Sequence, residues 1–253
     1  HYHRTGTGTY GQGTDPVTGA AYNPKFRSEE CWATHNSLVS YFGRLNYNLL
    51  DRYLITATFR ADGSSRFAKG HKWGYFPSAA LAWKINNEPF MKNVKWLNDL
   101  KLRVGWGKTG QQNGIDDFLY MPLYVRSDQY AQYPLGDTYY YTTRPNKYNE
   151  NLTWEKTTTY NAGIDFAALN NRFSFSIDGY VRKTTDLLSE VSVVSGVTFG
   201  DKLMQNIGSL KNYGLELAFD VKPVVTMDFT WDLTYHVGWN KNTITELKAG
   251  AQD

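Results

Sequence analysis

The sequence predicts an all-β protein, and more narrowly a segment of an antiparallel β-barrel that spans a membrane. Apolar and polar residues alternate with a period of two in eight segments, the segments are long, and the connections between them alternate between short and long. Successive side chains of a β-strand point to opposite faces, so this period gives each strand one apolar and one hydrophilic face.

The first four segments show the alternation in order along the chain. They span residues 40–49, 53–62, 78–85 and 100–107. Their apolar faces carry Tyr41, Gly43, Leu45, Tyr47 and Leu49; Tyr53, Ile55, Ala57, Phe59 and Ala61; Ala79, Leu81, Trp83 and Ile85; and Leu100, Leu102, Val104 and Trp106. The intervening positions are polar or small, as Lys101, Arg103 and Gly105 illustrate, and each segment is therefore predicted to be a strand.

The last four segments span residues 154–166, 173–182, 213–221 and 229–240. Their apolar faces carry Trp154, Tyr160, Ala162, Ile164 and Phe166; Phe173, Phe175, Ile177 and Val181; Tyr213, Leu215, Leu217, Phe219 and Val221; and Phe229, Trp231, Leu233, Tyr235, Val237 and Trp239. Many of the eight segments reach about ten to thirteen residues, close to the ~9–11 that a tilted strand needs to cross a bilayer.

The connections support a membrane barrel over a soluble sandwich. Short links at residues 50–52, 167–172 and 222–228 and a moderate one at 86–97, with room for a helical turn, alternate with long loops at 63–74, 109–152 and 183–209. Short turns on one rim and long loops on the other are typical of outer-membrane barrels. The domain interpretation is an extracellular loop region at 1–39 and a partial barrel at 40–253 with these three extracellular loops.

Aromatic residues gather near both ends of the apolar faces. The row near the short-turn rim is Tyr47, Tyr53, Trp83, Phe166, Phe173, Phe219 and Phe229, and the row near the long-loop rim is Tyr41, Phe59, Trp106, Trp154, Tyr213 and Trp239. Such rings settle at the depth of lipid headgroups, so two rows predict two membrane interfaces. Because an open sheet edge is costly in hydrocarbon, the strands must close, and we expect an arc of a wider barrel.

Five stretches resemble one family. They are residues 60–67 (RADGSSRF), 73–78 (WGYFPS), 100–111 (LKLRVGWGKTGQ), 151–157 (NLTWEKT) and 206–216 (NIGSLKNYGLE). In this order they are similar to the later barrel of SusC/RagA-type TonB-dependent transporters, and the resemblance covers about residues 40–247. It implies a plugged outer-membrane barrel of about 22 strands. It also implies energy from the TonB complex, a SusD-like surface lipoprotein as a lid, and oligosaccharides or peptides as cargo.

Candidate site residues come from the loop at 109–152, which is rich in tyrosine. Tyr139, Tyr140 and Tyr141 are predicted to contact cargo or the lid, because tyrosine offers a flat apolar face and a hydroxyl at low entropic cost. The alternative is that the tyrosines pack a small core inside the loop. On the inner wall, Arg60, Asp62 and Arg66 form either a charge network or solvated pairs, and Gly105 and Gly107 leave room for a plug or relieve crowding.

The sequence favours no catalytic, metal or nucleic-acid site. No Ser/His/Asp or Cys/His arrangement has a recognisable spacing, and the 27 Lys and Arg residues against 24 acidic ones form no basic cluster. The Gly6–Gly11 match to a dinucleotide motif lacks its strand and helix, and His1 and His3 lack a third ligand. We expect no enzyme activity, no cofactor and no metal, with membrane lipid as a partner. The alternatives left open are a passive pore or adhesin, and a soluble sugar-binding sandwich.

Overall fold

The computed structural model describes residues 2–3, 13–14, 21–22, 32–33, 35–126, 132–145, 147–192 and 202–247. The chain divides into two units, His1–Ser37 and Leu38–Asp253. In the first, β1 (Tyr2–His3) pairs with β4 (Trp32–Ala33), and β2 (Gly13–Thr14) pairs with β3 (Ala21–Tyr22). The Gly6–Gly11 motif and His1 lie outside the described residues, and the extracellular position of 1–39 stays a prediction.

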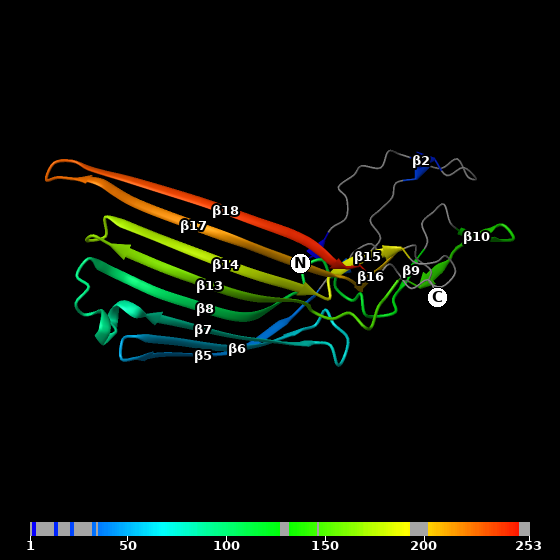
Figure 1. Cartoon of the computed structure of the whole chain (residues 1–253). Helices are drawn as coiled ribbons and strands as arrows, with labels where there is room; N and C mark the ends of the chain where they lie inside the picture. The colour runs from blue at the N-terminus through cyan, green and yellow to red at the C-terminus, as the bar shows by residue number, and fades with distance from the viewer. Residues whose placement is uncertain are drawn as a thin grey trace. The chain divides into compact units, whose positions relative to one another are not determined.

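The second unit is built on one eight-stranded antiparallel sheet, drawn as the row of long arrows in Figure 1. In chain order its strands are β5 (Leu38–Leu49), β6 (Tyr53–Ser64), β7 (Trp73–Lys84), β8 (Leu97–Gln111), β13 (Glu155–Ala168), β14 (Phe173–Thr185), β17 (Ser209–Val225) and β18 (Thr230–Glu246). Each pairs with the preceding and following strand of this set, in the order β18-β17-β14-β13-β8-β7-β6-β5. The predicted all-β meander is confirmed, and each predicted segment corresponds to one strand.

The two faces of the sheet differ as the alternation predicts. On one face, which we call the outward face, large apolar side chains stand exposed: Trp231 is 51% and Leu233 48% exposed. The other, inner face carries charged, hydrogen-bonded residues in the middle of the sheet, such as Arg103, Asp165 and Asp178. A soluble sandwich would bury the apolar face under a second sheet. The apolar side chains are exposed from Leu45 on β5 to Trp231 on β18, which suits contact with lipid instead.

Several strands are longer than the alternation indicates. β7 begins at Trp73, so the predicted loop at 63–74 shrinks to residues 65–72. Trp73 and Tyr75 thereby join the outward face, where Trp73 stacks on Tyr41 with ring centroids 6.0 Å apart. β17 runs on to Val225 through a register shift between Val221 and Val224. The predicted turn at 222–228 is therefore too long, and Pro223 lies in the irregularity of the ladder, where proline is tolerated.

The connections on the short-turn rim are compact. Leu50 and Asp51 have φ of 56° and 54°, the left-handed conformation that a tight hairpin turn requires. The connection between β7 and β8 holds two 3-10 turns, η2 (Ile85–Asn87) and η3 (Pro89–Met91). Within the described part of the chain, no helix has the length and apolarity needed to cross a bilayer.

The assignment of the faces predicts opposite responses to a charge at neighbouring positions of β17. In the full-length protein, Leu217→Arg places a guanidinium on the outward face at mid-strand and should lower the free energy of unfolding by about 2–4 kcal/mol. Ala218→Arg, one residue on and facing inward beside Glu216 and His236, should cost much less. Urea unfolding in lipid vesicles measures both. Equal losses would contradict the assignment.

Candidate functional site

The inner face carries a continuous band of polar side chains across β8, β13, β14, β17 and β18. The strand register aligns two neighbouring rows of residues. One row is Arg103, Gly163, Asp178, Glu216 and Gly238, and the other is Lys101, Asp165, Ser176, Ala218 and His236. Charged and small side chains therefore meet in the middle of the sheet.

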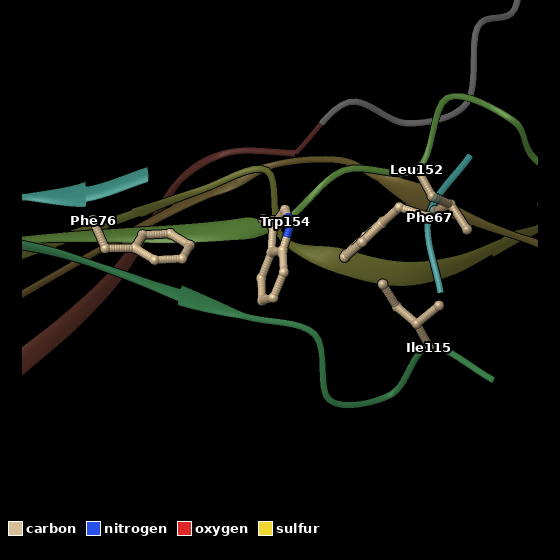
Figure 2. Close-up of a cluster of buried hydrophobic side chains, with 5 residues drawn as sticks. All are labelled: Phe67, Phe76, Ile115, Leu152 and Trp154. Atoms are coloured by element: carbon tan, nitrogen blue, oxygen red, sulfur yellow. The ribbon is translucent and has the colours of Figure 1, made fainter. Parts of the chain in front are cut away.

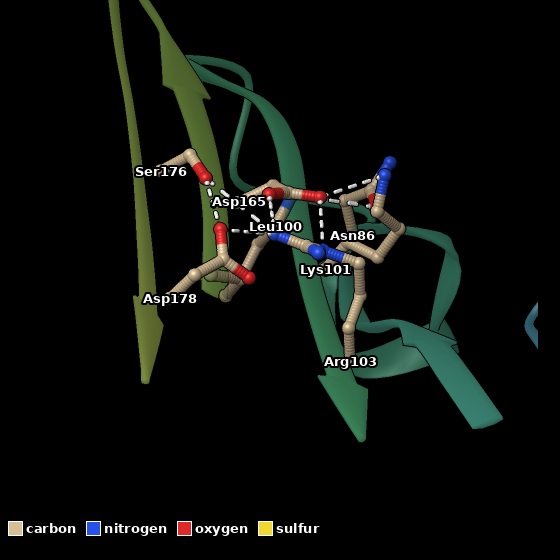
Figure 3. A network of polar contacts seen from close by, with 7 residues as sticks. All are labelled: Asn86, Leu100, Lys101, Arg103, Asp165, Ser176 and Asp178. Atoms are coloured by element: carbon tan, nitrogen blue, oxygen red, sulfur yellow. Dashed lines mark hydrogen bonds and ion pairs between the residues drawn. The ribbon is translucent and has the colours of Figure 1, made fainter. Parts of the chain in front are cut away.

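Arg103 is the centre of an ion-pair network in this band (Figure 3). Its Nε and Nη2 donate to the two carboxylate oxygens of Asp165 at 2.9 and 2.7 Å, and Nη2 also donates to Asp178 at 2.9 Å. Lys101 Nζ lies 2.8 Å from Asp165, and Ser176 donates its hydroxyl to Asp178 at 2.9 Å. The two cations balance the two carboxylates, and the bidentate pair fixes the plane of the guanidinium.

Gly163 allows the network to cross β13. It pairs with Arg103 on one side and Asp178 on the other, so the guanidinium must pass over its backbone. A Cβ at Gly163 would overlap Asp178 Oδ1 and come within 2.9 Å of Arg103 Nη2. The absence of a side chain at this position is thus what brings charges from β8 and β14 together.

The glycines that the sequence analysis singled out have a similar role. A Cβ at Gly105 would overlap the Asn161 side chain, and one at Gly107 would lie 3.0 Å from Ser78 Cβ. Both contacts come from neighbouring strands of the same wall. They support the interpretation that these glycines relieve crowding.

The predicted grouping of Arg60, Asp62 and Arg66 is only partly correct. Arg60 Nε donates to both oxygens of the buried Asp62 at 2.8 Å. Arg66 instead donates to Asp117 at 3.0 Å and so joins the loop after β6 to the loop after β8. The Arg103 network was missed, because each of its members was assigned to a polar face but only the register shows which of them meet.

A depression of about 320 Å³ lies beside the network on the inner face. Its polar lining comes from Ser176, Asp178, Glu216 and His236, and its floor from Ala218 and Gly238. Two carboxylates and one imidazole give it acceptors for hydroxyl, amide or cationic groups. Its small floor residues are what leave the space.

A hydrophobic cluster joins the long loops at the long-loop rim of the sheet. We call it the rim cluster; its buried members are Phe67, Phe76, Ile115, Leu152 and Trp154, with Leu119, Leu188 and Met204 packed against it. The indole of Trp154 lies between the two phenyl rings, with centroids 5.0 Å from Phe67 and 5.6 Å from Phe76, as Figure 2 shows. Apart from Phe76 on β7, these residues come from the connections after β6, β8 and β14, so the cluster joins all three.

The rim cluster corrects one prediction. Trp154 was assigned to the outward aromatic row, but it is 4% exposed, and its indole N–H donates to the carbonyl of Lys72 at 3.1 Å. β13 begins one residue later, at Glu155, so Trp154 has left the alternation of the strand. The β7–β8 ladder ends at the pair Ser78 and Gly107, next to Pro77. Beyond this pair the ladder no longer joins the two strands, and Phe76 packs into the cluster there.

Polar contacts reinforce the attachment of the third long loop, which already packs Leu188 and Met204 against the cluster. Asn206 accepts from the backbone of Thr153 at 2.8 Å and donates to the carbonyls of Thr153 and Asp186 at 2.8 and 2.9 Å. This asparagine ends the hairpin of β15 (Leu188–Ser192) and β16 (Lys202–Asn206). The loops before β13 and before β17 are thereby joined at their bases.

The predicted site residues lie on an exposed hairpin that we call the tyrosine arm, residues 124–145. Its described parts are β9 (Tyr124–Arg126), β10 (Gln132–Leu135), β11 (Thr138–Tyr141) and β12 (Thr143–Pro145), with β9 paired to β12 and β10 to β11. Tyr139, Tyr140 and Tyr141 are 63, 52 and 37% exposed. All three lie on β11, and they are not packed into the rim cluster.

The strand alternation divides the three tyrosines between two faces of the arm. Tyr139 and Tyr141 share one face, and Arg126 lies over the Tyr141 ring at 3.9 Å. Tyr140 faces the other way and pairs with Tyr133 across the hairpin. One flat partner therefore cannot contact all three rings at once.

Among the residues that the structure describes, no group of three or more His, Cys, Asp or Glu side chains could hold a metal ion. His236 lines the depression on the inner face. What the site offers is binding surface: a charged wall, a polar depression and exposed rings at the rim.

Comparisons with known proteins agree with this geometry. The family described as TonB-dependent receptor-like β-barrel matches residues 1–252. The chain is 59% identical over 250 residues to the TonB-dependent receptor SusC of Bacteroides thetaiotaomicron, and 38% identical over 221 residues to the TonB-dependent receptor P39 of Formosa agariphila. These matches cover 99% and 85% of this chain but 25% and 20% of those proteins. The chain thus spans about a quarter or less of the length of these relatives.

Among solved structures, the chain is similar to the RagAB peptide importer. In the closed-closed state the TM-score is 0.73 at 29% identity, over 85% of this chain and 23% of that one. In the open-open state the TM-score is 0.74.

Gly163 gives a sharp test of the network. In the full-length protein, Gly163→Ala should displace Asp178 and lower the free energy of unfolding by about 1–3 kcal/mol, the usual cost of overpacking. Gly43→Ala is the matched control, because nothing lies within 4 Å of a Cβ there. Adding Asp178→Ala should remove most of the cost of Gly163→Ala in a double-mutant cycle of urea unfolding. Additive effects would contradict the proposed role of Gly163.

Proposed function

The chain belongs to the TonB-dependent receptor β-barrel family, and from this premise we propose that it forms eight consecutive strands in the wall of an outer-membrane nutrient importer. The observation that carries the proposal is the two-sided sheet. An exposed apolar face suits acyl chains, and the opposite face carries balanced ion pairs that suit a water-filled or plugged bore.

In this proposal the wall lies in the bacterial outer membrane with its long loops outside the cell. The short turns then face the periplasm, as is usual for such barrels. The region 1–39 is an extracellular loop region, and the three long loops stand above the bore. The role is transport and not catalysis.

The proposed cargo is an oligosaccharide or a peptide. Two of the proteins to which the chain is similar are a SusC receptor and a peptide importer. The inner depression offers carboxylate and imidazole groups that suit the hydroxyl groups of sugars as well as the amides of peptides. Transport is driven by the TonB complex through parts of the protein outside this segment.

The proposed lid is a SusD-like surface lipoprotein, which contacts the long-loop rim. The tyrosine arm is the most exposed element there, and its rings suit a protein or sugar surface. Because Tyr139 and Tyr141 face away from Tyr140, we assign the two faces of the arm to different contacts, one to the lid and the other to cargo. The rim cluster supplies a stable base for the three loops at this rim.

A passive pore or adhesin is the alternative function. Both would have the same two-sided wall, so the difference lies in the energy requirement. In cells that carry the full-length receptor, uptake of a labelled oligosaccharide or peptide should be lost when TonB is deleted. Uptake of a small solute through an unrelated porin should persist as the control. Receptor-dependent uptake that survives without TonB would favour the passive pore.

The tyrosine arm is tested by alanine substitutions in the full-length receptor. Tyr139→Ala with Tyr141→Ala should weaken one of two measured quantities, lipoprotein co-purification or cargo uptake, by about tenfold or more, the effect of losing aromatic anchors. Tyr140→Ala should affect the other quantity. Tyr75→Ala removes a similarly exposed ring from the outward face and serves as the control. If neither quantity changes in any arm variant, the assignment is wrong.

A further inference from the structure

The connection between β7 and β8, residues 85–96, is held against the outward face of the sheet. Glu88 is buried, and its Oε1 accepts from the Tyr53 hydroxyl at 2.8 Å and from the Trp83 indole N–H at 2.9 Å. Tyr53 and Trp83 are cross-strand partners that point outward and stack on each other. A carboxylate that joins these two side chains must lie on their side of the wall. The connection therefore turns over the rim toward lipid and away from the bore.

A second contact fixes the far end of the connection on the same side. The Trp96 ring lies 6.2 Å from that of Phe166, which points outward and stacks on Phe175 at 4.9 Å. The Trp96 carbonyl accepts from the backbone N–H of Leu169 in the next turn at 2.8 Å. β7 and β8 lie inside the sheet, away from its edge strands β5 and β18, so strands added at either edge would not cover this connection.

The exposed surface of the connection is both apolar and cationic. Phe90 is 66% and Trp96 56% exposed, and Lys92 and Lys95 are also exposed. Within the described ranges, neither lysine takes part in an ion pair. Glu88 is the one acidic residue between 85 and 97, and Arg52 Nη1 lies 3.5 Å from its Oε2. Two positive charges that no described acidic residue balances thus lie between two exposed rings in the sequence.

The Glu88 carboxylate, which anchors the connection to β6 and β7, does not pair with Lys92 or Lys95. Hydrogen bonds from Trp83 and Tyr53, together with the charge of Arg52, hold the pKa of Glu88 below its usual value, so this carboxylate is ionised at neutral pH. Its hydrogen-bond partners are supplied by β6 and β7. Lys92 and Lys95 remain available for a ligand outside the protein.

We propose that residues 90–96 form a lipid-binding site for anionic phospholipid headgroups in the leaflet beside the short-turn rim. Phe90 and Trp96 insert at the boundary of headgroups and acyl chains, and the ammonium groups of Lys92 and Lys95 bind lipid phosphates. Exposed rings together with lysines are the features by which short segments lie in a membrane interface. The surface continues the aromatic row of the outward face, which favours lipid over a soluble protein as its partner.

Depth in the membrane is the first test. The full-length receptor, with Cys31 and any other free cysteine replaced by serine, receives a nitroxide through Phe90→Cys and is placed in nanodiscs of phosphatidylethanolamine and phosphatidylglycerol. The label should be accessible to oxygen and shielded from a water-soluble nickel complex. Asn170→Cys, on the exposed tip of the β13–β14 turn, is the control and should be accessible to nickel. Equal nickel accessibility at the two positions would overturn the proposal.

Headgroup selectivity is the second test. Spin-labelled phosphatidylglycerol should be enriched around the receptor over spin-labelled phosphatidylethanolamine. Lys92→Gln with Lys95→Gln should reduce this enrichment at the site by about fivefold or more, since each lysine near an anionic surface contributes ~1 kcal/mol. Lys222→Gln, on the same rim but paired with Asp232, should leave it unchanged. Unchanged enrichment in the double variant, or an equal loss in the control, would overturn the proposal.

Discussion

The need to pair every backbone N–H and C=O away from water is the constraint on which the rest of this structure depends. Hydrocarbon offers no hydrogen bonds, so a wall that crosses it must consist of long, adjacent strands with their ladders intact. The eight strands meet this need by antiparallel pairing of chain neighbours. Once the backbone is arranged in this way, the side chains have only two directions, and the character of each face follows from the sequence.

The inner face shows how register converts this simple pattern into a specific surface. Lys101, Arg103, Asp165 and Asp178 become one network because three strands place them in neighbouring rows and because Gly163 has no side chain. An ion pair that remains partly exposed contributes little stability by itself. Its consequence is geometric, because the Arg103 guanidinium fixes the positions of the Asp165 and Asp178 carboxylates on the inner face.

The sequence allowed the strands and their faces to be predicted, and failed where the chain leaves the sheet. Period-two alternation is a local signal, so β8 and β18 were evident from their own residues. Trp154 was misassigned because alternation cannot show that a strand starts one residue later and that three loops share a cluster. Trp73 falls in the predicted loop at 63–74, and the strand that begins there is not evident from the alternation of 78–85 alone. The Arg103 network needed the register of three strands, and no single segment contains that information.

The division of the long-loop rim into a shared base and a free arm has an evolutionary consequence. A substitution at Phe67, Leu152 or Trp154 disturbs all three loops together. We therefore expect the residues at these positions to change slowly and together in evolution. The hairpin that bears Tyr139 and Tyr140 lies outside that cluster, and its tip can vary without loss of the scaffold. Such a protein can acquire a new binding preference through substitutions in the tyrosine arm alone, while the rim cluster beneath it is retained.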